Sequence, residues 1–272
     1  MGLSTAACGA LLALEPLDFD NGAARGDAAT ESDPGRDVVV PPLDGNADDA
    51  RGDGGPALGF CEGLDGGLDG AIIVFCDDFE RATPLENRWV GATTNGGQLS
   101  LSAGASVSGT RSLLVEIPGG AGAVVKTAFL TTPTLSTGVG SVTVEMDVRV
   151  DVAPPATGSY PSNGFVFGRS YHVGGGFEPA FITVPVAGTF NPGFLPEDPP
   201  PPVPFVTAAW HHFTWRIVTP AITLEVKPKA GGDPVVRTDT RGVDPQYFRI
   251  GAETEPNVGP VKMFIDNIVM YR

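Results

Sequence analysis

The stretch "VTVEMDVRV", Val142–Val150, alternates strictly between apolar and polar residues. Successive side chains of a β-strand point to opposite faces of the sheet, so this pattern predicts a strand with one face in a core and the other in water. The set expected in the core is Val142, Val144, Met146, Val148 and Val150. The set expected in water is Thr143, Glu145, Asp147, Arg149 and Asp151.

Ten further runs of β-branched and apolar residues flank this stretch, and Gly, Pro and Asn separate them. No long segment has the apolar spacing of a helix, and 37 Gly and 26 Pro imply frequent turns. We therefore predict an all-β chain, a jelly-roll sandwich of two antiparallel sheets. The proline-rich segment 191–204 is expected to form an extended loop. The ten runs are 71–75, 97–102, 111–117, 123–130, 164–171, 180–186, 208–218, 221–228, 246–252 and 261–271.

The acidic charge is concentrated ahead of these strands. The chain has a formal net charge of -15, and residues 15–57 contain eleven acidic residues against three arginines. This segment has few aromatic residues and is too polar to form a core, so it is predicted to be a disordered acidic linker. Nucleic acid is excluded as a partner, because its binding needs a basic face.

The first fourteen residues, "MGLSTAACGALLAL", are mostly small or apolar. Thr5-Ala6-Ala7-Cys8 resembles the lipobox of bacterial lipoproteins, which implies export, lipidation of Cys8 and a place in the cell envelope or outside the cell. Residues 1–14 are thus interpreted as a partial lipoprotein-type export signal. No stretch has the eighteen apolar residues of a membrane span, so membrane attachment would depend on this lipid. The alternative is an apolar segment without function.

Two of the three cysteines, Cys61 and Cys76, flank a short glycine-rich loop. They predict a disulfide and therefore an oxidising compartment. The alternative is a pair of buried free thiols.

Three motifs in order resemble the concanavalin A-like lectin/glucanase superfamily, in both its laminin-G-like branch and its family 16 glycoside hydrolases. They are "FCDDFE" followed by Trp89, "WHHFTWRI" at 210–217 and "MFIDNIVMY" at 263–271. The resemblance covers about residues 72–272 and implies that residues 58–272 form one laminin-G-like β-sandwich.

The resemblance also implies a metal site and bears on catalysis. The superfamily often joins its first and last strands through calcium, and Asp78 and Asp266 match the ligand positions. Ordinary acidic turn residues are the alternative.

Family 16 hydrolases use Glu-x-Asp-x-x-Glu, and here Val150 stands where the second Glu belongs, so hydrolysis of that type is disfavoured. The adjacent His211 and His212 point to opposite faces and are expected to pack and form hydrogen bonds.

Recognition is therefore the expected role: a secreted or lipid-anchored module that binds a glycan or a protein partner. Aromatic rings that stack on sugars and fixed hydrogen-bonding groups occur near glycine-rich loops in 158–177. Packing at the core and its rim is the alternative for these side chains. The runners-up are a divergent polysaccharide hydrolase or lyase and a structural surface domain. The predicted ligand-binding residues are Tyr160, Asn163, Arg169, Tyr171 and His172.

Overall fold

The computed structural model places the described part of the chain in one compact unit, Ala57–Arg272. The predicted export signal with Cys8 and the predicted linker 15–57 lie outside the described residues. No helix in the described part is long and apolar enough to cross a membrane. The structure describes residues 59–64, 70–120, 124–135, 141–153, 165–171, 181–186, 189–193, 203–204, 206–218, 221–239, 246–254, 256 and 258–272.

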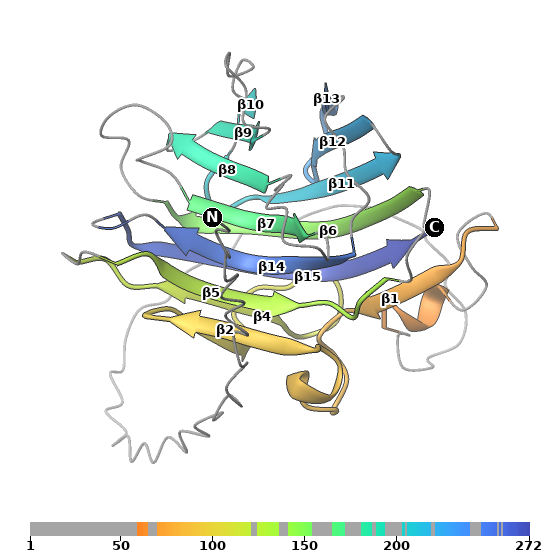
Figure 1. Ribbon diagram of the computed structural model, residues 1–272, viewed down its shortest axis with the longest axis horizontal. Coiled ribbons are helices and arrows are strands. Elements are labelled where there is room, and N and C mark those ends of the chain that lie inside the picture. The colour runs from red at the N-terminus through yellow and green to blue at the C-terminus, as the bar shows by residue number, and fades with distance from the viewer. Residues whose placement is uncertain are drawn as a thin grey trace, which may run out of the picture. The chain divides into compact units, whose positions relative to one another are not determined.

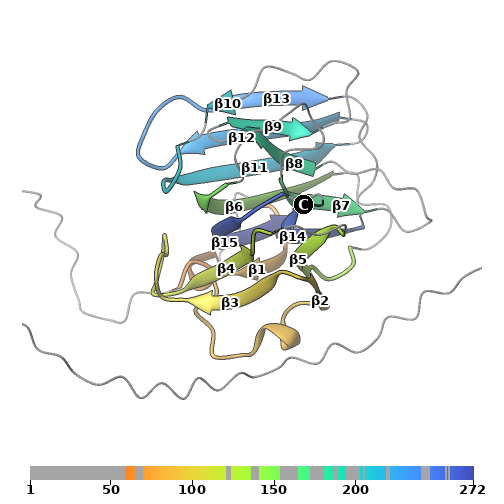
Figure 2. The same ribbon diagram turned by 90° about the vertical axis from the view of Figure 1, so that its left-hand side faces the viewer.

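The larger sheet has eight strands in the order β13-β12-β11-β6-β15-β4-β3, and β1 pairs with β15 outside that path. Figure 2 shows this order from β13 down to β3. The strands are β1 (Ile73–Asp77), β3 (Gln98–Ser102), β4 (Ser112–Ile117), β6 (Ser141–Val152), β11 (Trp210–Val218), β12 (Ala221–Pro228), β13 (Val235–Asp239) and β15 (Val261–Tyr271).

The second sheet has seven strands in the order β10-β9-β8-β7-β14-β5-β2 (Figure 1). All strand pairs in both sheets are antiparallel. The helical elements in the described ranges are two short 3-10 turns, η1 (Glu62–Leu64) and η2 (Leu85–Asn87), so the all-β prediction is confirmed. The strands are β2 (Gly91–Asn95), β5 (Lys126–Thr131), β7 (Phe165–Tyr171), β8 (Phe181–Val186), β9 (Thr189–Gly193), β10 (Val203–Pro204) and β14 (Tyr247–Thr254).

All eleven predicted runs form strands, and β2, β9, β10 and β13 are additional. The predicted loop 191–204 is partly wrong, because its ends belong to β9 and β10. The residues of β10 pair with β9 at the edge of the sheet, where a proline interrupts no second ladder. Short polar strands such as β2 have no apolar alternation, which is why the pattern missed them.

The inner faces of the two sheets form the core, and the predicted apolar set of β6 lies in it with at most 1% exposure. Phe213 and Trp215 of β11 join this core, and Trp215 packs edge-on against Phe248 of β14, with ring centroids 5.3 Å apart. The expectation that the opposite face of β6 is fully solvated is wrong: Asp147 is 1% exposed and Thr143 is 7% exposed. Neighbouring side chains cover this face, as described below.

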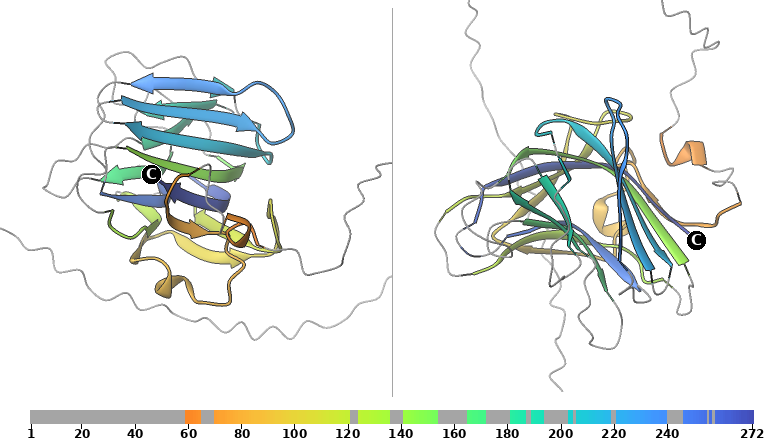
Figure 3. Two further views of the ribbon diagram at one scale, coloured as in Figure 1. Left: turned by 90° about the vertical axis from the view of Figure 1, so that its right-hand side faces the viewer. Right: turned by 90° about the horizontal axis from the view of Figure 1, so that it is seen from above.

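The predicted disulfide between Cys61 and Cys76 is present, with Cα atoms 5.8 Å apart. It ties the segment before β1 to β1 itself, which pairs antiparallel with the C-terminal strand. Backbone hydrogen bonds between Ile72 and Arg272 extend that pairing, so β1 lies beside the C-terminus (Figure 3).

Candidate functional site

The outward face of the seven-stranded sheet carries an arginine and a tyrosine on β14. Phe248 and Ile250 are fully buried in the core, so alternation places Tyr247 and Arg249 on the opposite face, where both are half-buried. The backbone register pairs Tyr247 with Tyr171 and Arg249 with Arg169 of β7. One cross-strand pair of positions therefore holds two tyrosines, and the pair two residues further along β14 holds two arginines.

Two of the five predicted ligand residues thus fall at this position. Arg169 and Tyr171 lie on β7, whereas Tyr160, Asn163 and His172 lie outside the described residues. Sequence reasoning did not select Tyr247 and Arg249. The signal was available in "QYFRIGA", because the alternation that buries Phe248 and Ile250 also turns their neighbours away from the core.

The backbones of β14 and β5 are in close contact beside Arg249. On β5, Thr131 pairs with Arg249, and Phe129 pairs with Gly251. Gly251 has φ +149°, and a Cβ at this position would lie 2.0 Å from the carbonyl oxygen of Ala128. A glycine is therefore required for β14 and β5 to approach at this row.

The opening motif forms a buried hydrogen-bonded corner. The Asp77 carboxylate accepts hydrogen bonds from the Trp89 indole Nε1–H (2.7 Å) and the Phe79 amide (2.9 Å), and it pairs with the Arg88 guanidinium. The Phe79 and Trp89 rings stack with centroids 6.5 Å apart. Burial raises the pKa of Asp77, despite these hydrogen bonds. Asp77 therefore holds the Trp89 indole and the Arg88 guanidinium in place at this corner.

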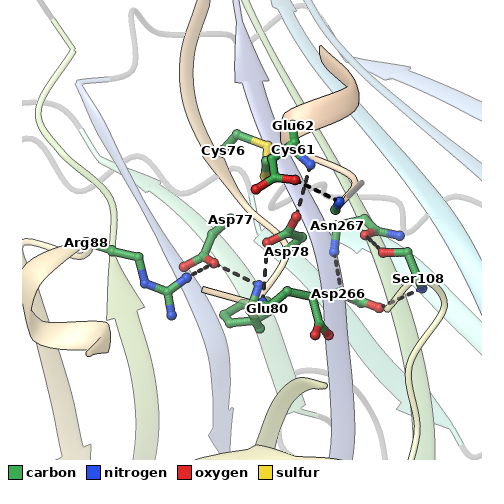
Figure 4. Close-up of a disulfide and its surroundings, with 12 residues drawn as sticks. Cys61, Glu62, Cys76, Asp77, Asp78, Glu80, Arg88, Ser108, Asp266 and Asn267 are labelled. Carbon is green, nitrogen blue, oxygen red and sulfur yellow. Dashed lines mark hydrogen bonds and ion pairs between the residues drawn. A yellow bond between two sulfur atoms is a disulfide. The ribbon is translucent and has the colours of Figure 1, made fainter. Parts of the chain in front are cut away.

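The two predicted calcium ligands, Asp78 and Asp266, are both buried. Figure 4 shows the residues that surround each carboxylate. The Asp78 carboxylate accepts the Cys61 amide at 3.0 Å and the Glu80 amide at 3.3 Å. Asp266 Oδ2 accepts the amides of Val107 (2.7 Å) and Ser108 (3.2 Å), and Oδ1 accepts that of Asn267 (2.9 Å). Backbone N–H groups thus face every carboxylate oxygen of the two residues.

This donor set does not by itself fit calcium. The ion needs six to eight oxygen ligands, and N–H groups directed at the carboxylates compete with it. Within the described ranges, no group of three or more His, Cys, Asp or Glu residues could hold a metal. Burial raises the pKa of Asp266 to about 6. Calcium binding stays a prediction. It would be supported if calcium raised the Tm of the wild type but not that of Asp266→Asn.

A polar network covers the outer face of the eight-stranded sheet around Asp147. Asp147 Oδ1 lies 2.9 Å from His212 Nδ1, and Oδ2 accepts hydrogen bonds from Asn267 Nδ2 (2.8 Å) and Lys229 Nζ (3.2 Å). Burial alone would raise the pKa of Asp147, but the hydrogen bonds from His212 and Asn267 outweigh it and the pKa is lowered. Three strands and the turn after β12 therefore meet at one carboxylate.

Glu145 extends the network. Its Oε1 accepts the Tyr271 hydroxyl at 2.6 Å, and its Oε2 lies 3.6 Å from His212 Nε2. Asp147 and Glu145 together raise the pKa of His212 to about 9. His211 points into the core, and its Nδ1 lies 3.1 Å from the Ala209 carbonyl oxygen. Both histidines pack and form hydrogen bonds, as expected.

The fold defines a structural class: a β-sandwich of two antiparallel sheets. The structure is similar to "Cellulose induced protein, Cip1", with TM-score 0.50 and 21% identity over 72% of this chain and 96% of that one. It is also similar to the endo-β-1,4-glucuronan lyase of the fungus Trichoderma reesei, with TM-score 0.51 and 12% identity over 74% and 95%.

A third similar structure is the catalytic domain of a glycoside hydrolase family 131 protein from Coprinopsis cinerea, with TM-score 0.46 and 16% identity over 74% of this chain and 94% of that one. No family model matches the sequence. No curated protein matches it either. At identities of 21% and 12%, the similarity to Cip1 and to the glucuronan lyase shows the fold alone: a jelly-roll sandwich of two antiparallel sheets.

Proposed function

We propose that this chain is a binding module that recognises a polysaccharide through the outward face of its seven-stranded sheet. The observation that carries the proposal is the register of β14 and β7, which pairs Tyr247 with Tyr171 and Arg249 with Arg169. Tyrosine rings stack on the apolar faces of sugars, and arginines donate several hydrogen bonds in a fixed plane. The similarity to Cip1 and to the glucuronan lyase supports a glycan as the ligand.

The contacts of Glu145 and Asp147, the two carboxylates that begin the hydrolase pattern, favour binding of a glycan without cleavage. Retaining hydrolysis needs a nucleophile and an acid/base about 5 Å apart on opposite sides of a sugar bond. Here Glu145 and Asp147 are held by Tyr271, His212, Asn267 and Lys229, and Val150 stands in the core at the third position. These carboxylates stabilise the sheet, so this stretch of β6 provides no acid/base pair of that type.

Export and lipid attachment at Cys8 are part of the proposal. The Cys61–Cys76 disulfide supports an oxidising compartment, which is where a glycan-binding module meets its ligand. Metabolic labelling with a radioactive fatty acid tests the anchor. We expect label in the wild type and none in Cys8→Ser, whereas equal labelling of both would contradict the anchor.

The test of glycan binding uses the full chain, expressed in an oxidising compartment and incubated with soluble and insoluble polysaccharides. Retained protein and released reducing sugar are recorded together, with calcium or a chelator. We expect retention on at least one polysaccharide and a loss of up to about tenfold in affinity for Tyr247→Ala, because one stacked ring contributes about 0.5–1.5 kcal/mol. Val236→Ala is the control, since this exposed residue lies on β13 of the other sheet.

The other functions predict different results. Released sugar would identify a hydrolase or lyase and would overturn the assignment as a simple binder. Neither retention nor release across the panel would indicate a protein partner or a structural surface domain. Retention that Tyr247→Ala leaves unchanged would place the glycan on another face.

A further inference from the structure

We propose that two copies of this chain associate through β3, an edge strand of the eight-stranded sheet, and form a two-fold symmetric dimer with one continuous sheet. The inference goes beyond glycan binding and does not depend on it. Figure 2 shows β3 at one edge of the sheet and β13 at the other. In the part of the chain that the structure describes, β3 pairs with β4 alone. Backbone N–H and C=O groups on its other side are therefore open to a further strand.

β3 lacks the features that protect edge strands from pairing with another chain. Natural edge strands carry charged residues, proline or bulges that discourage such pairing. The sequence of β3, "QLSLS", contains no charged residue and no proline, and its register with β4 runs without a bulge from Gln98 to Ser102. The opposite edge strand, β13, contains Arg237 and Asp239. Of these two edge strands, β3 is therefore the one suited to accept another strand.

The pattern of β3 is self-complementary, which identifies the added strand as a second copy of β3. Residues that lie opposite each other on antiparallel strands share a face of the sheet. A two-fold axis at Ser100 places Leu99 opposite Leu101 of the second copy. The same axis places Gln98 opposite Ser102 of the second copy and Ser100 opposite itself. Apolar residues therefore meet apolar ones on the inner face, and polar residues meet polar ones on the outer face.

The burial of the β3 side chains agrees with this pairing. Leu99 and Leu101 are half-buried and pack against the core from its rim. A second β3 would cover more of their apolar surface, which favours association. Gln98 and Ser100 are exposed, so the outer face of the junction stays in water.

The acidic charge of the chain opposes association, but the junction itself is free of close like charges. Glu116 lies on β4 opposite Gln98, and its Oε1 is 3.9 Å from Lys262 Nζ. Neighbouring strands are about 4.8 Å apart, so the Glu116 residues of the two copies would be separated by three spacings, or at least about 14 Å. This distance exceeds the Debye length of about 8 Å at physiological salt, so their repulsion is screened.

The dimer is expected to be weak, because an edge contact of five residue pairs is small. Its consequence for binding is avidity. A dimer carries two copies of every ligand-binding face, so a polymer with repeated sites can engage both at once.

The experiment measures the mass of the full chain by sedimentation and light scattering from about 1 µM to about 1 mM, the range of weak association. All chains carry Cys8→Ser, so neither a lipid nor an intermolecular disulfide can join two copies. Ser100→Lys and Ser100→Glu each place two like charges at the proposed axis. Thr238→Lys is the matched control, because Thr238 is exposed on β13 at the opposite edge. Thermal unfolding of each variant reports whether it folds.

We expect the mass to rise from that of one chain towards that of two as concentration increases. Ser100→Lys and Ser100→Glu should each weaken dimerisation at least about tenfold, because like charges face each other. An equimolar mixture of these two variants should restore the dimer, and Thr238→Lys should keep it. A single-chain mass at every concentration would overturn the dimer. A dimer that the Ser100 substitutions leave intact would overturn the β3 interface, and failure of the mixture to restore association would contradict the axis at Ser100.

Discussion

His212 lies between two carboxylates, and its protonation is linked to the stability of the outer sheet face. Its folded pKa of about 9 is above the ordinary value of 6.5, so the stabilising contribution is complete below about pH 6.5 and is lost as pH rises through 9. The pKa of Asp147 is lowered, so its contribution is present above its ordinary value of 3.8 and is lost as pH falls. The network is therefore most stabilising near neutral pH.

We expect His212→Gln to lower the free energy of unfolding by about 1–2 kcal/mol at pH 7, because it removes a charge-assisted hydrogen bond to a buried carboxylate. The difference from the wild type should shrink as pH rises from 7 to 10. Urea unfolding at several pH values measures both. A constant difference across this range would show that His212 is not an imidazolium in the folded protein.

Gly251 lies against the backbone of β5, where an added Cβ would lie 2.0 Å from the carbonyl oxygen of Ala128. We expect Gly251→Ala to destabilise the domain by at least about 3 kcal/mol, through a clash with the Ala128 carbonyl and a φ of +149° that L-residues rarely adopt. Gly63→Ala is the matched control, because no atom lies within 4 Å of its Cβ position, and it should change stability by less than about 0.5 kcal/mol. Equal effects of the two substitutions on Tm would contradict this.

At the scale of elements, β15 connects most of the larger sheet. It pairs with β1, β4 and β6, and its register with β6 shifts between Asp266 and Val269. At this bulge Asn267 has φ +51°, which asparagine tolerates better than most residues. The bulge directs the Asn267 amide to Asp147 and the Asp266 carboxylate to the 107–108 backbone.

β1 is held by its pairing with β15 and also by the Cys61–Cys76 disulfide, which joins it to the segment before it. We expect the double substitution of Cys61 and Cys76 by serine to cost about 2–4 kcal/mol, because the bridge closes a loop with a sequence separation of 15. It should also loosen the hydrogen bond from the Cys61 amide to Asp78. Guanidinium unfolding with and without a reductant measures the cost. If reduction lowers the stability of the wild type but not of the variant, the loss belongs to this bridge.

At the scale of the whole molecule, residues 57–272 contain the described core, both sheets and the disulfide. We therefore expect removal of residues 1–56 to leave Tm within about 2 °C of the full chain, since a change below about 0.5 kcal/mol shifts Tm of such a domain by that amount. Calorimetry of both chains measures this. A larger drop would show that the N-terminal segment packs on the domain.

The sandwich was predictable because the long strands bury one face each, and burial imposes a period of two on "VTVEMDVRV" and "WHHFTWRIV". Short strands such as β2 and β10 form through backbone pairing at the sheet ends, where side-chain pattern carries little information. The glycan candidates in 158–177 were found by composition alone. Composition could not find Tyr247 and Arg249, which lie about 75 residues further along the chain.

The sequence by itself determined the all-β class, eleven of the described strands, the disulfide and the apolar face of β6. Each follows from local alternation or from the spacing of two cysteines. Only the tertiary structure decided that the opposite face of β6 is partly buried under His212, Lys229 and Asn267, and that β14 pairs with β7. The reason is that hydrogen bonding between distant strands sets the register, and the register decides which side chains meet.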